Sequence, residues 1–303
     1  MTKTETIPKK LTVFTAEYNK EKIMSGKLYL CPTPIGNLSD ISERIIETLK
    51  NADLIAAEDT RNTLKLLNYF DIVVPLTSYY EHNKVSKGRT LIDKLQDGKN
   101  IALVSDAGMP AISDPGEDLV KLCIENGIEI VSLPGPSAFT TALVASGLPT
   151  GRFTFEGFLT TNKKNRLEHL EEIKNDTRTL IFYEAPHKLL NTLKDMLEIL
   201  GNRKITLARE LTKKFEEYVR TTLEDAVKKY ENEQPKGEFV LIIEGKNKEE
   251  LKLEEKEALP SPEELLNKYI SEGESGKPLV KKVAEELDMP KREVYDIYLK
   301  IKG

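Results

Sequence analysis

The sequence lacks the glycine patterns of the most common nucleotide-binding loops. None of its 17 glycines lies two residues from another. The Gly-x-Gly-x-x-Gly dinucleotide fingerprint and the glycine-rich loop of the common Rossmann methyltransferases are therefore absent. No Gly-Lys pair is followed by Ser or Thr, which excludes a phosphate-binding P-loop. Any small-molecule ligand must be held by other loops.

Cysteine and long apolar runs are also scarce. The two cysteines are Cys31 and Cys123, with no CxxC pair and no neighbouring histidine. This spacing argues against a structural zinc site and a disulfide framework, and it predicts reduced thiols in the cytosol. No metal is implied. The first ten residues are polar and no run approaches about 18 apolar residues, the length that spans a bilayer. We therefore expect a soluble cytoplasmic protein with no membrane partner.

An excess of positive charge is missing too, because the formal net charge is −5. Phosphate contacts dominate nucleic-acid affinity, so this charge at first argues against an RNA partner. Residues 160–215, however, contain 12 Lys and Arg against 8 Asp and Glu. This local excess is compatible with an RNA-binding surface and equally with a solvated helix face.

The sequence does contain three loops rich in glycine and proline, each after an apolar run. The runs at 28–30, 101–104 and 128–131 have the composition of strands in a mostly parallel sheet. They lead into PTPIGNL (32–38), SDAGMPAISDPG (105–116) and SLPGPSA (132–138). In open α/β sheets the ligand crevice lies outside the carboxyl ends of the strands. These loops therefore predict a small-molecule site, and we expect the chain to be an enzyme.

Together with four further segments, these loops resemble the ordered motifs of the RsmI branch of the tetrapyrrole methylase superfamily. The further segments are AAEDTR (56–61), FYEAPHK (182–188), ARELTKKFEEYVRTTL (208–223) and GEFVLIIEG (237–245). The match runs in order from about Gly26 to Gly245. The resemblance implies an S-adenosylmethionine-dependent enzyme that methylates the ribose 2'-hydroxyl of a decoding-site cytidine in 16S rRNA. It also implies 16S rRNA or the small ribosomal subunit as the partner, and a homodimer.

The expected fold is two α/β domains of the tetrapyrrole methylase type, with a cofactor cleft between them, and a small C-terminal helical unit. Strand and helix patterns alternate in the first domain, whereas four strand-like runs with short connections in the second favour mixed strand directions. The predicted segments are a poorly ordered N-terminal extension (1–25), the first domain (26–148), the second domain (149–245), a charged linker (246–260) and a unit with helix-turn-helix spacing (261–303).

The predicted cofactor site combines the three loops with two motifs of the second domain. Tight turns, and free amides at the start of the helix near Ser137, would suit the carboxylate of S-adenosylmethionine. From the loops we expect contacts from Pro34, Gly36, Asn37, Asp106, Ala107, Gly108, Pro110, Ser113, Pro134, Gly135, Pro136 and Ser137. By motif position, the resemblance adds Tyr183, Glu184, Ala185, Ala208 and Arg209. For any single loop, an ordinary turn at a strand end is the competing interpretation.

The predicted catalytic group follows the apolar run 54–57 and consists of Glu58, Asp59 and Arg61. A ribose hydroxyl is a weak nucleophile, so a base would contribute about 10² to 10⁴ in rate. A carboxylate could accept the proton or hold the ribose, while Arg61 could clamp an RNA phosphate. The alternative is a salt bridge at the end of a strand. His187 is either a further base candidate or a residue at the start of a helix that begins at Pro186.

Two other functions are open at this point. A tetrapyrrole C-methyltransferase would share the fold and the cofactor, but PTPIGNL, AAEDTR and the C-terminal helical unit look like the rRNA branch. A non-enzymatic nucleic-acid-binding regulator would rely on the C-terminal unit. The charge of that unit is nearly balanced, with seven basic against five acidic residues from Lys277 on.

Overall fold

The structure is a computed structural model that describes residues 25–302 apart from residue 258. Nearly all of the predicted N-terminal extension lies outside the described residues. The chain divides into two compact units, with the boundary between Ser137 and Ala138. The second unit includes the C-terminal helices, which have a core of their own.

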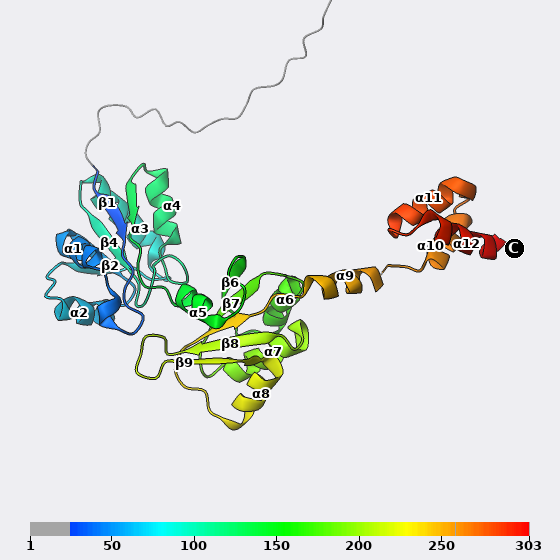
Figure 1. The fold of residues 1–303 in the computed structure, drawn as a ribbon. Helices are drawn as coiled ribbons and strands as arrows, with labels where there is room; N and C mark the ends of the chain where they lie inside the picture. The colour runs from blue at the N-terminus through cyan, green and yellow to red at the C-terminus, as the bar shows by residue number, and fades with distance from the viewer. Residues whose placement is uncertain (1–24, 258, 303) are drawn as a thin grey trace, which may run out of the picture. The chain divides into compact units, whose positions relative to one another are not determined.

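The first unit is built on a five-stranded parallel sheet (Figure 1). Its strands are β1 (Lys27–Leu30), β2 (Leu54–Ala57), β3 (Leu76–Ser78), β4 (Ile101–Val104) and β5 (Glu129–Ser132). The order is β3-β2-β4-β1-β5, and each pairing is parallel. The central strand β4 is buried along its whole length, which explains its unbroken apolar sequence. The carboxyl ends of the five strands therefore lie at one edge of the sheet.

Helices cover both faces of this sheet. They are α1 (Glu43–Asn51), α2 (Thr60–Tyr69), α3 (Lys84–Gln96) and α4 (Glu117–Glu125), with a 3-10 turn η1 (Leu38–Asp40) before α1. On one face α1 and α2 pack through Ile45 and Leu67. On the other face α3 and α4 pack through Leu91 and Leu119. Alternate strand residues join the two cores, as expected for a sheet that is buried on both sides.

The second unit contains a mixed five-stranded sheet. Its strands are β6 (Phe153–Phe158), β7 (Thr179–Glu184), β8 (Lys204–Arg209), β9 (Glu217–Thr222) and β10 (Phe239–Ile243). The order is β6-β7-β10-β8-β9. Strands β6 and β7 pair in parallel, and the other pairs are antiparallel. The mixed directions agree with the prediction, and the edge strand β9 is additional to the four predicted runs.

Helices cover both faces of the second sheet as well. They are α5 (Ala138–Ser146), α6 (Lys163–Ile173), α7 (Leu189–Leu200) and α8 (Leu223–Asn232). The main core lies between one face and α6, α7 and α8, with Leu170, Leu193 and Val227 among its members. Helix α5 contacts the opposite face, where Thr206 Oγ1 donates to Ser146 O at 3.0 Å. Because α5 packs on this sheet, the second unit begins before the boundary predicted at residue 148.

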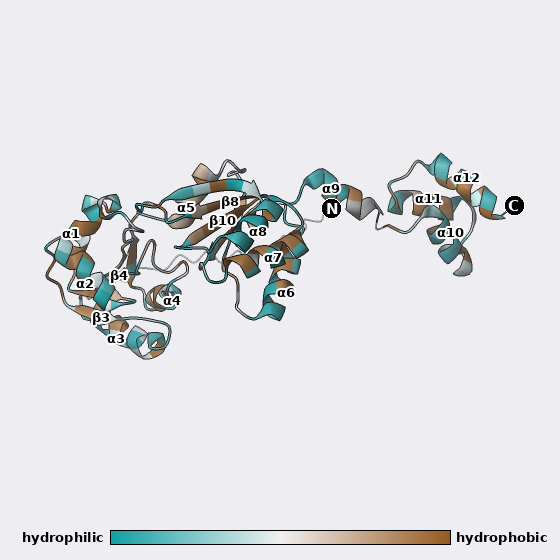
Figure 2. Ribbon diagram, turned by 90° about the horizontal axis from the view of Figure 1, so that it is seen from below, coloured by the Kyte–Doolittle hydropathy of each residue, from teal (hydrophilic) through white to brown (hydrophobic). Residues whose placement is uncertain are grey.

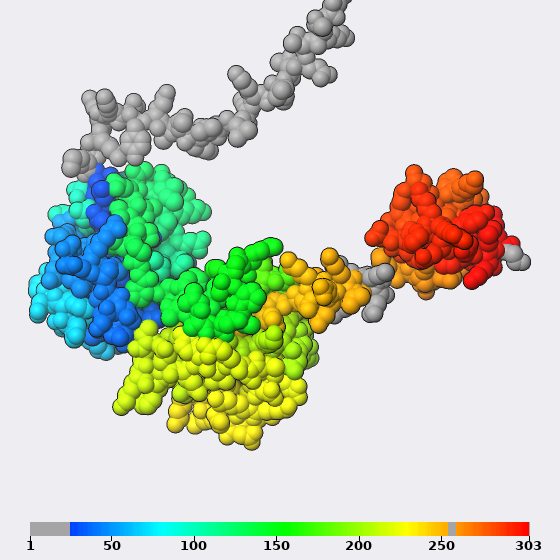
Figure 3. All heavy atoms as spheres, in the orientation of Figure 1, coloured from blue at the N-terminus to red at the C-terminus, as the bar shows by residue number. Residues whose placement is uncertain are grey.

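The C-terminal helices form a small unit with its own core. After α9 (Lys248–Glu257), the unit consists of α10 (Pro262–Ser271), α11 (Gly276–Glu286) and α12 (Lys291–Lys302). Figure 2 shows polar and apolar faces on α10 to α12, and Figure 3 shows these helices, in orange to red, packed together. Leu266, Leu279 and Val294 are fully buried in their core. Helix α9 occupies most of the predicted charged linker, because its Glu- and Lys-rich sequence contains neither Gly nor Pro.

Candidate functional site

Two of the predicted loops are joined at the carboxyl edge of the first sheet. Thr33 N donates to Gly108 O, and Gly108 N donates to Thr33 O, both at 2.9 Å. Side chains reinforce the junction, since Thr33 Oγ1 donates to Ser105 O and Ser105 Oγ donates to Gly108 O, each at 3.0 Å. The loop after β1 and the loop after β4 therefore form one rigid junction.

The third loop, after β5, packs against this junction through glycines. Gly108 has φ +83°, and a Cβ there would lie 3.7 Å from Pro136 O. At Gly135, a Cβ would lie 2.8 Å from Pro32 Cβ and 3.1 Å from Ile45 Cδ1. Glycine is thus required at position 108 by the positive φ and at position 135 by the packing against Pro32.

The predicted cofactor residues of the first unit surround this junction and differ in exposure. Asn37 caps η1, because its side chain accepts a hydrogen bond from Ser39 N at 3.0 Å. Gly108 and Pro110 are buried. The partly buried residues are Pro34, Pro136 and Ser137. The exposed residues are Gly36, Asn37, Asp106, Ala107, Ser113, Pro134 and Gly135.

An acidic cluster from two strand ends lies beside the junction and consists of Glu58, Asp106 and Asp114. Burial raises the pKa of Glu58, and the carboxylates of Asp114 and Asp106 raise it further. Burial also raises the pKa of Asp114, against the effect of a hydrogen bond with Ser105. A carboxylate with a raised pKa is a stronger base, so Glu58 and Asp114 are the better proton acceptors. The sequence prediction includes Glu58 but not Asp114.

Asp59 and Arg61, the other two predicted catalytic residues, bind each other. Asp59 caps α2 and accepts from Arg61 N at 2.8 Å. Its carboxylate also accepts from the Arg61 guanidinium, from Nε at 3.0 Å and from Nη2 at 2.6 Å. These bonds lower the pKa of Asp59 to about 2, so Asp59 is a weak base at neutral pH. Asp59 and Arg61 therefore form a salt bridge at the end of a strand, which is the alternative interpretation of this motif.

Asp106 connects the loop after β4 to the start of α2. Its Oδ1 accepts from Asp59 N at 3.2 Å, and its Oδ2 accepts from Asn62 Nδ2 at 2.9 Å. These bonds orient the Asp106 carboxylate and offset part of its negative charge. Asn62 is not among the predicted site residues. Asn62 lies three residues after Asp59, which caps α2, and this spacing is the sequence signal that could have drawn attention to it. Its hydrogen-bond partner, Asp106, is distant in the chain.

In the second unit, four predicted residues lie at the ends of two strands that flank β10. Tyr183 and Ala208 occupy one row across the sheet, and Glu184 and Arg209 occupy the next. Successive rows point to opposite faces, and the second row shares its face with the core against α6, α7 and α8. The structure therefore brings these residues to one sheet edge but divides their side chains between two faces.

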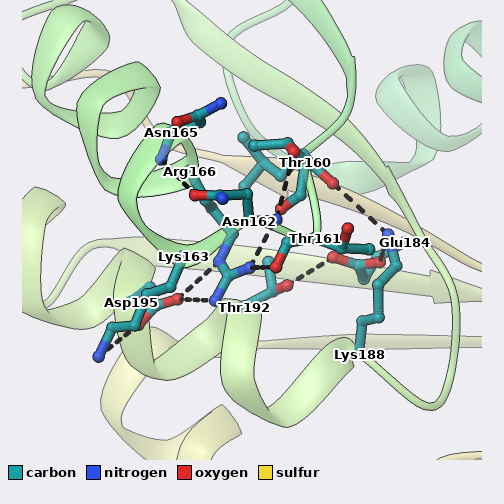
Figure 4. Close-up of polar contacts among 11 residues, drawn as sticks. Thr160, Thr161, Asn162, Lys163, Asn165, Arg166, Glu184, Lys188, Thr192 and Asp195 are labelled. Atoms are coloured by element: carbon teal, nitrogen blue, oxygen red, sulfur yellow. Dashed lines mark hydrogen bonds and ion pairs between the residues drawn. The ribbon is translucent and has the colours of Figure 1, made fainter.

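Glu184 is the centre of a buried network (Figure 4). The residue is 2% exposed. Its Oε2 accepts from Thr192 Oγ1 at 2.5 Å, while its Oε1 accepts from Ala185 N at 2.8 Å and pairs with Lys188 Nζ at 3.1 Å. Both the Glu184 carboxylate and the Ala185 amide are thus committed to the turn between β7 and α7. In this structure their contribution to a ligand site is to fix that turn.

A second ion pair in Figure 4 fixes the loop after β6. Arg166 Nε donates to Asp195 Oδ2 at 2.7 Å, and Arg166 Nη1 donates to Thr160 O at 3.0 Å and to Thr161 O at 3.2 Å. Because β6 and β7 are parallel, their following loops lie at the same edge. Both loops are therefore held by buried charged groups.

Arg209 has an unsatisfied donor. Its Nη2 lies 3.2 Å from Glu217 Oε2, but its Nε is buried and has no hydrogen-bond partner among the described atoms. Buried donors are almost always paired in proteins. Because this Nε is buried and Arg209 shares its face with the core, the structure does not show it open to a ligand.

His187 lies in a turn rather than in a helix. Helix α7 begins at Leu189, so the helix start expected at Pro186 is too early. The side chain is exposed. Because His187 lies two residues before the first residue of α7, the structure does not support a role at the start of that helix.

Two negative findings apply to the described residues. Within residues 25–302 apart from 258, no group of three or more His, Cys, Asp and Glu side chains is placed to hold a metal ion. In the same part of the chain, each helix is too short or too polar to cross a membrane.

Comparisons with known proteins show which protein family this chain resembles. A family model, tetrapyrrole (corrin/porphyrin) methylases, matches residues 27–227. The ribosomal RNA small subunit methyltransferase I of Halalkalibacterium halodurans is 54% identical over 286 residues, which cover 94% of this chain and 98% of that protein. The protein of the same name from Bacillus subtilis is 51% identical over 90% of this chain and 94% of its own length. Among solved structures, uroporphyrin-III C-methyltransferase from Thermus thermophilus complexed with S-adenyl homocysteine matches with a TM-score of 0.50. It is 18% identical over 72% of this chain and 97% of that chain.

Proposed function

The chain belongs to the tetrapyrrole methylase family and, within it, to the ribosomal RNA small subunit methyltransferase I proteins, and from this membership we propose that it methylates 16S rRNA. The reaction transfers the methyl group of S-adenosylmethionine to the ribose 2'-hydroxyl of a decoding-site cytidine. The observation that carries this proposal is the 54% identity with an rRNA methyltransferase over 98% of that protein's length.

A tetrapyrrole substrate has less support. The solved uroporphyrin-III C-methyltransferase is 18% identical to this chain, and identity at that level supports the fold alone. The rRNA relatives are 51% and 54% identical over nearly their whole length. A C-terminal unit with its own core is also easier to reconcile with a large RNA substrate than with a small macrocycle.

The residues of the site fit S-adenosylmethionine, which supplies the methyl group on a positively charged sulfur. The acidic cluster of Glu58, Asp106 and Asp114 favours a positive charge nearby. Helix α5 begins directly after Ser137, so the positive end of its dipole lies at this loop and favours a carboxylate there. We keep the loop residues and Tyr183 and Ala208 as the proposed contact set, with Glu184 and Ala185 in a supporting role.

We assign the proton acceptor to Glu58. The 2'-hydroxyl must lose a proton as it attacks the methyl group, and a base is most effective when its pKa is near the working pH. Among the three predicted catalytic residues, Glu58 has the raised pKa and Asp59 the lowered one. Arg61 has a side chain that is 86% exposed, so it is available to an RNA phosphate at the cost of its bonds to Asp59.

Kinetics of two matched variants test this assignment. Glu58→Gln should lower kcat by about 10² or more, while Asp59→Asn, which keeps the helix cap, should lower it far less. The affinity for S-adenosylmethionine, measured by calorimetry, should stay near that of the wild type in both. If Glu58→Gln keeps full kcat, another group takes the proton.

The function itself is tested by mapping ribose methylation in 16S rRNA by mass spectrometry. Cells with the protein should contain the modified decoding-site cytidine, and cells without it should not. Purified protein and S-adenosylmethionine should restore the modification on naked rRNA or on small subunits from the deficient cells. Absence of methylation in both arms would favour the regulator alternative, and transfer to porphyrinoid precursors would favour the C-methyltransferase alternative.

The proposal also includes a cytoplasmic location and a homodimer. The location follows from a ribosomal substrate, and the dimer follows from the family resemblance. Light scattering at several protein concentrations measures the oligomeric state directly.

A further inference from the structure

A small cavity lies next to the loop junction, on the α2 side of the first unit. Its volume is about 260 Å³, and its lining includes Leu38, Leu66 and Tyr69 as apolar walls. Asn62 and Asp106 also line it and supply polar groups. The cavity therefore joins an apolar slot directly to a carboxylate of the proposed active site.

The apolar wall is formed by a helix face that is not used for the core. Helix α2 buries Thr63 and Leu67, as an amphipathic helix on a sheet should. Leu66 and Tyr69 lie on a neighbouring stripe, three residues apart, and Tyr69 is 64% exposed. The Tyr69 ring is held edge-on by Phe70, with 4.9 Å between ring centroids. An exposed but oriented aromatic ring is suited to stacking on a planar ligand.

The charge around this cavity is compatible with RNA, because its lining pairs one cation, Lys65, with one carboxylate, Asp106. Helix α2 carries Arg61 and Lys65 and contains no Asp or Glu. Lys65 lines the cavity, and its Nζ donates to Asn62 Oδ1 at 3.3 Å. The negative charge of Asp106 is partly offset by its two donors, Asp59 N and Asn62 Nδ2.

A second cavity, on the other side of the junction, has a strongly acidic lining. Its volume is about 560 Å³, and its lining includes five carboxylates against Lys84 and His82. The Lys84 ammonium is already bound to Glu81 and Asp118, both at 2.8 Å. Such a surface repels phosphate groups. Of the two cavities, the one on α2 is thus the better fit for RNA.

We infer that the α2 cavity receives a nucleobase of the RNA substrate, stacked on Tyr69, with Lys65 near the adjoining phosphate. This inference rests on the proposed function. Proteins read single-stranded RNA by stacking splayed bases on aromatic side chains and by contacting base edges with polar groups. A base held beside Asp106 is attached to a ribose that reaches the acidic cluster, so the cavity orients the 2'-hydroxyl without taking part in the chemistry.

The magnitude of the expected effect follows from base stacking. Loss of one stacking partner by alanine substitution costs about 1 to 3 kcal/mol, and about 1.4 kcal/mol corresponds to a tenfold change. Tyr69→Ala should therefore raise the KM for RNA by about tenfold. Tyr69→Phe and Tyr69→Trp keep an aromatic face and should stay close to the wild type. Leu38→Trp fills the cavity from its other wall and should also raise KM.

The test compares these variants on small ribosomal subunits isolated from cells that lack the protein. Leu64→Ala is the matched control, because Leu64 is also an exposed apolar residue of α2 but does not line the cavity. We expect KM for subunits to rise in Tyr69→Ala and Leu38→Trp and to stay unchanged in Leu64→Ala. The affinity for S-adenosylmethionine should be the same in all four proteins; a loss in Tyr69→Ala would assign the cavity to the cofactor instead and overturn the inference, because Pro34 and Asp106 of the proposed contact set also line it.

The outcomes separate this inference from the proposed function. If the wild type methylates small subunits but Tyr69→Ala and Leu38→Trp have wild-type KM, the cavity does not hold a base and the inference is overturned. An equal rise of KM in Leu64→Ala would overturn it as well, because the effect would not be specific to the cavity. If the wild type itself fails to methylate 16S rRNA, the proposed function fails first.

Discussion

At the scale of single residues, the neighbours of a carboxylate decide what it can do. Glu58 and Asp59 are adjacent in the sequence, yet burial raises the pKa of the first and the Arg61 side chain lowers that of the second to about 2. Sequence reasoning places both in one catalytic group. Their different environments give them different roles, one as a base and one as a helix cap.

The raised pKa of Glu58 predicts a pH-dependent stability effect. A carboxyl group with a raised pKa in the folded state stabilises the fold fully below its unfolded pKa, and this contribution is lost as the pH rises through the folded pKa. The glutamine of Glu58→Gln cannot ionise, so this variant does not lose stability as the pH rises. Its melting temperature should match the wild type near pH 4 and exceed it near pH 8, as measured by scanning fluorimetry. A constant difference across this range would show that ionisation of Glu58 is not involved.

The buried network of Glu184 predicts a large stability effect without a large effect on ligand affinity. Glu184→Ala leaves Thr192 and Lys188 without their partner, which should cost about 3 kcal/mol in the free energy of unfolding. Glu184→Gln keeps an acceptor oxygen for Ala185 N, and its amide nitrogen can donate to Thr192 Oγ1, so it should cost less. Urea denaturation measures both. If the folded Glu184→Gln protein, which keeps the turn, fails to bind S-adenosylmethionine, Glu184 contacts the cofactor itself.

At the scale of elements, the active region depends on loops that are fixed to one another. The loops after β1 and β4 share two backbone hydrogen bonds, and the loop after β5 packs on them at Gly135. Fixed loops of this kind keep backbone groups in place before a ligand binds, which lowers the entropy cost of binding.

Gly135→Val tests this arrangement. The added side chain would overlap Pro32 and Ile45, so the loop after β5 should shift and the affinity for S-adenosylmethionine should fall by at least tenfold. Gly151→Val is the control, because a Cβ at Gly151 would meet nothing within 4 Å. Calorimetry on both folded variants measures their affinity for S-adenosylmethionine. Equal affinities would remove this loop from the cofactor site.

At the scale of the whole molecule, the C-terminal unit carries its own core and a set of cations with different roles. Lys282 is occupied within the unit, since its Nζ lies 3.7 Å from the centre of the Tyr269 ring and donates to Glu274 at 2.7 Å. Lys291 and Arg292 are exposed at the start of α12. These two side chains are therefore better placed than Lys282 to meet RNA phosphates.

Removal of this unit should affect RNA binding and leave the cofactor site intact. A chain that ends after Asn247 keeps the hydrogen bond from Lys246 N to Asp176 O. It should bind S-adenosylmethionine normally, have a higher KM for RNA and show a salt dependence reduced by about one unit for each lost phosphate contact. Lys291→Ala with Arg292→Ala in the full chain should reproduce part of the change. An unchanged KM across salt concentrations would assign the unit another role.

The sequence by itself determined the two α/β cores, the three loops and the family, because apolar runs, glycine and proline report on local structure. It missed β9, whose six residues at the edge of the sheet are partly exposed. It also assigns 138–146 to the first domain, whereas α5 packs on the second sheet, because packing of a helix depends on contacts distant in the chain. Tertiary structure alone decided that Glu184 is buried in a network, that Asn62 holds Asp106, and that Glu58 and Asp59 differ in pKa. Each of these depends on which residues of other segments surround a side chain, and that information is not local in the sequence.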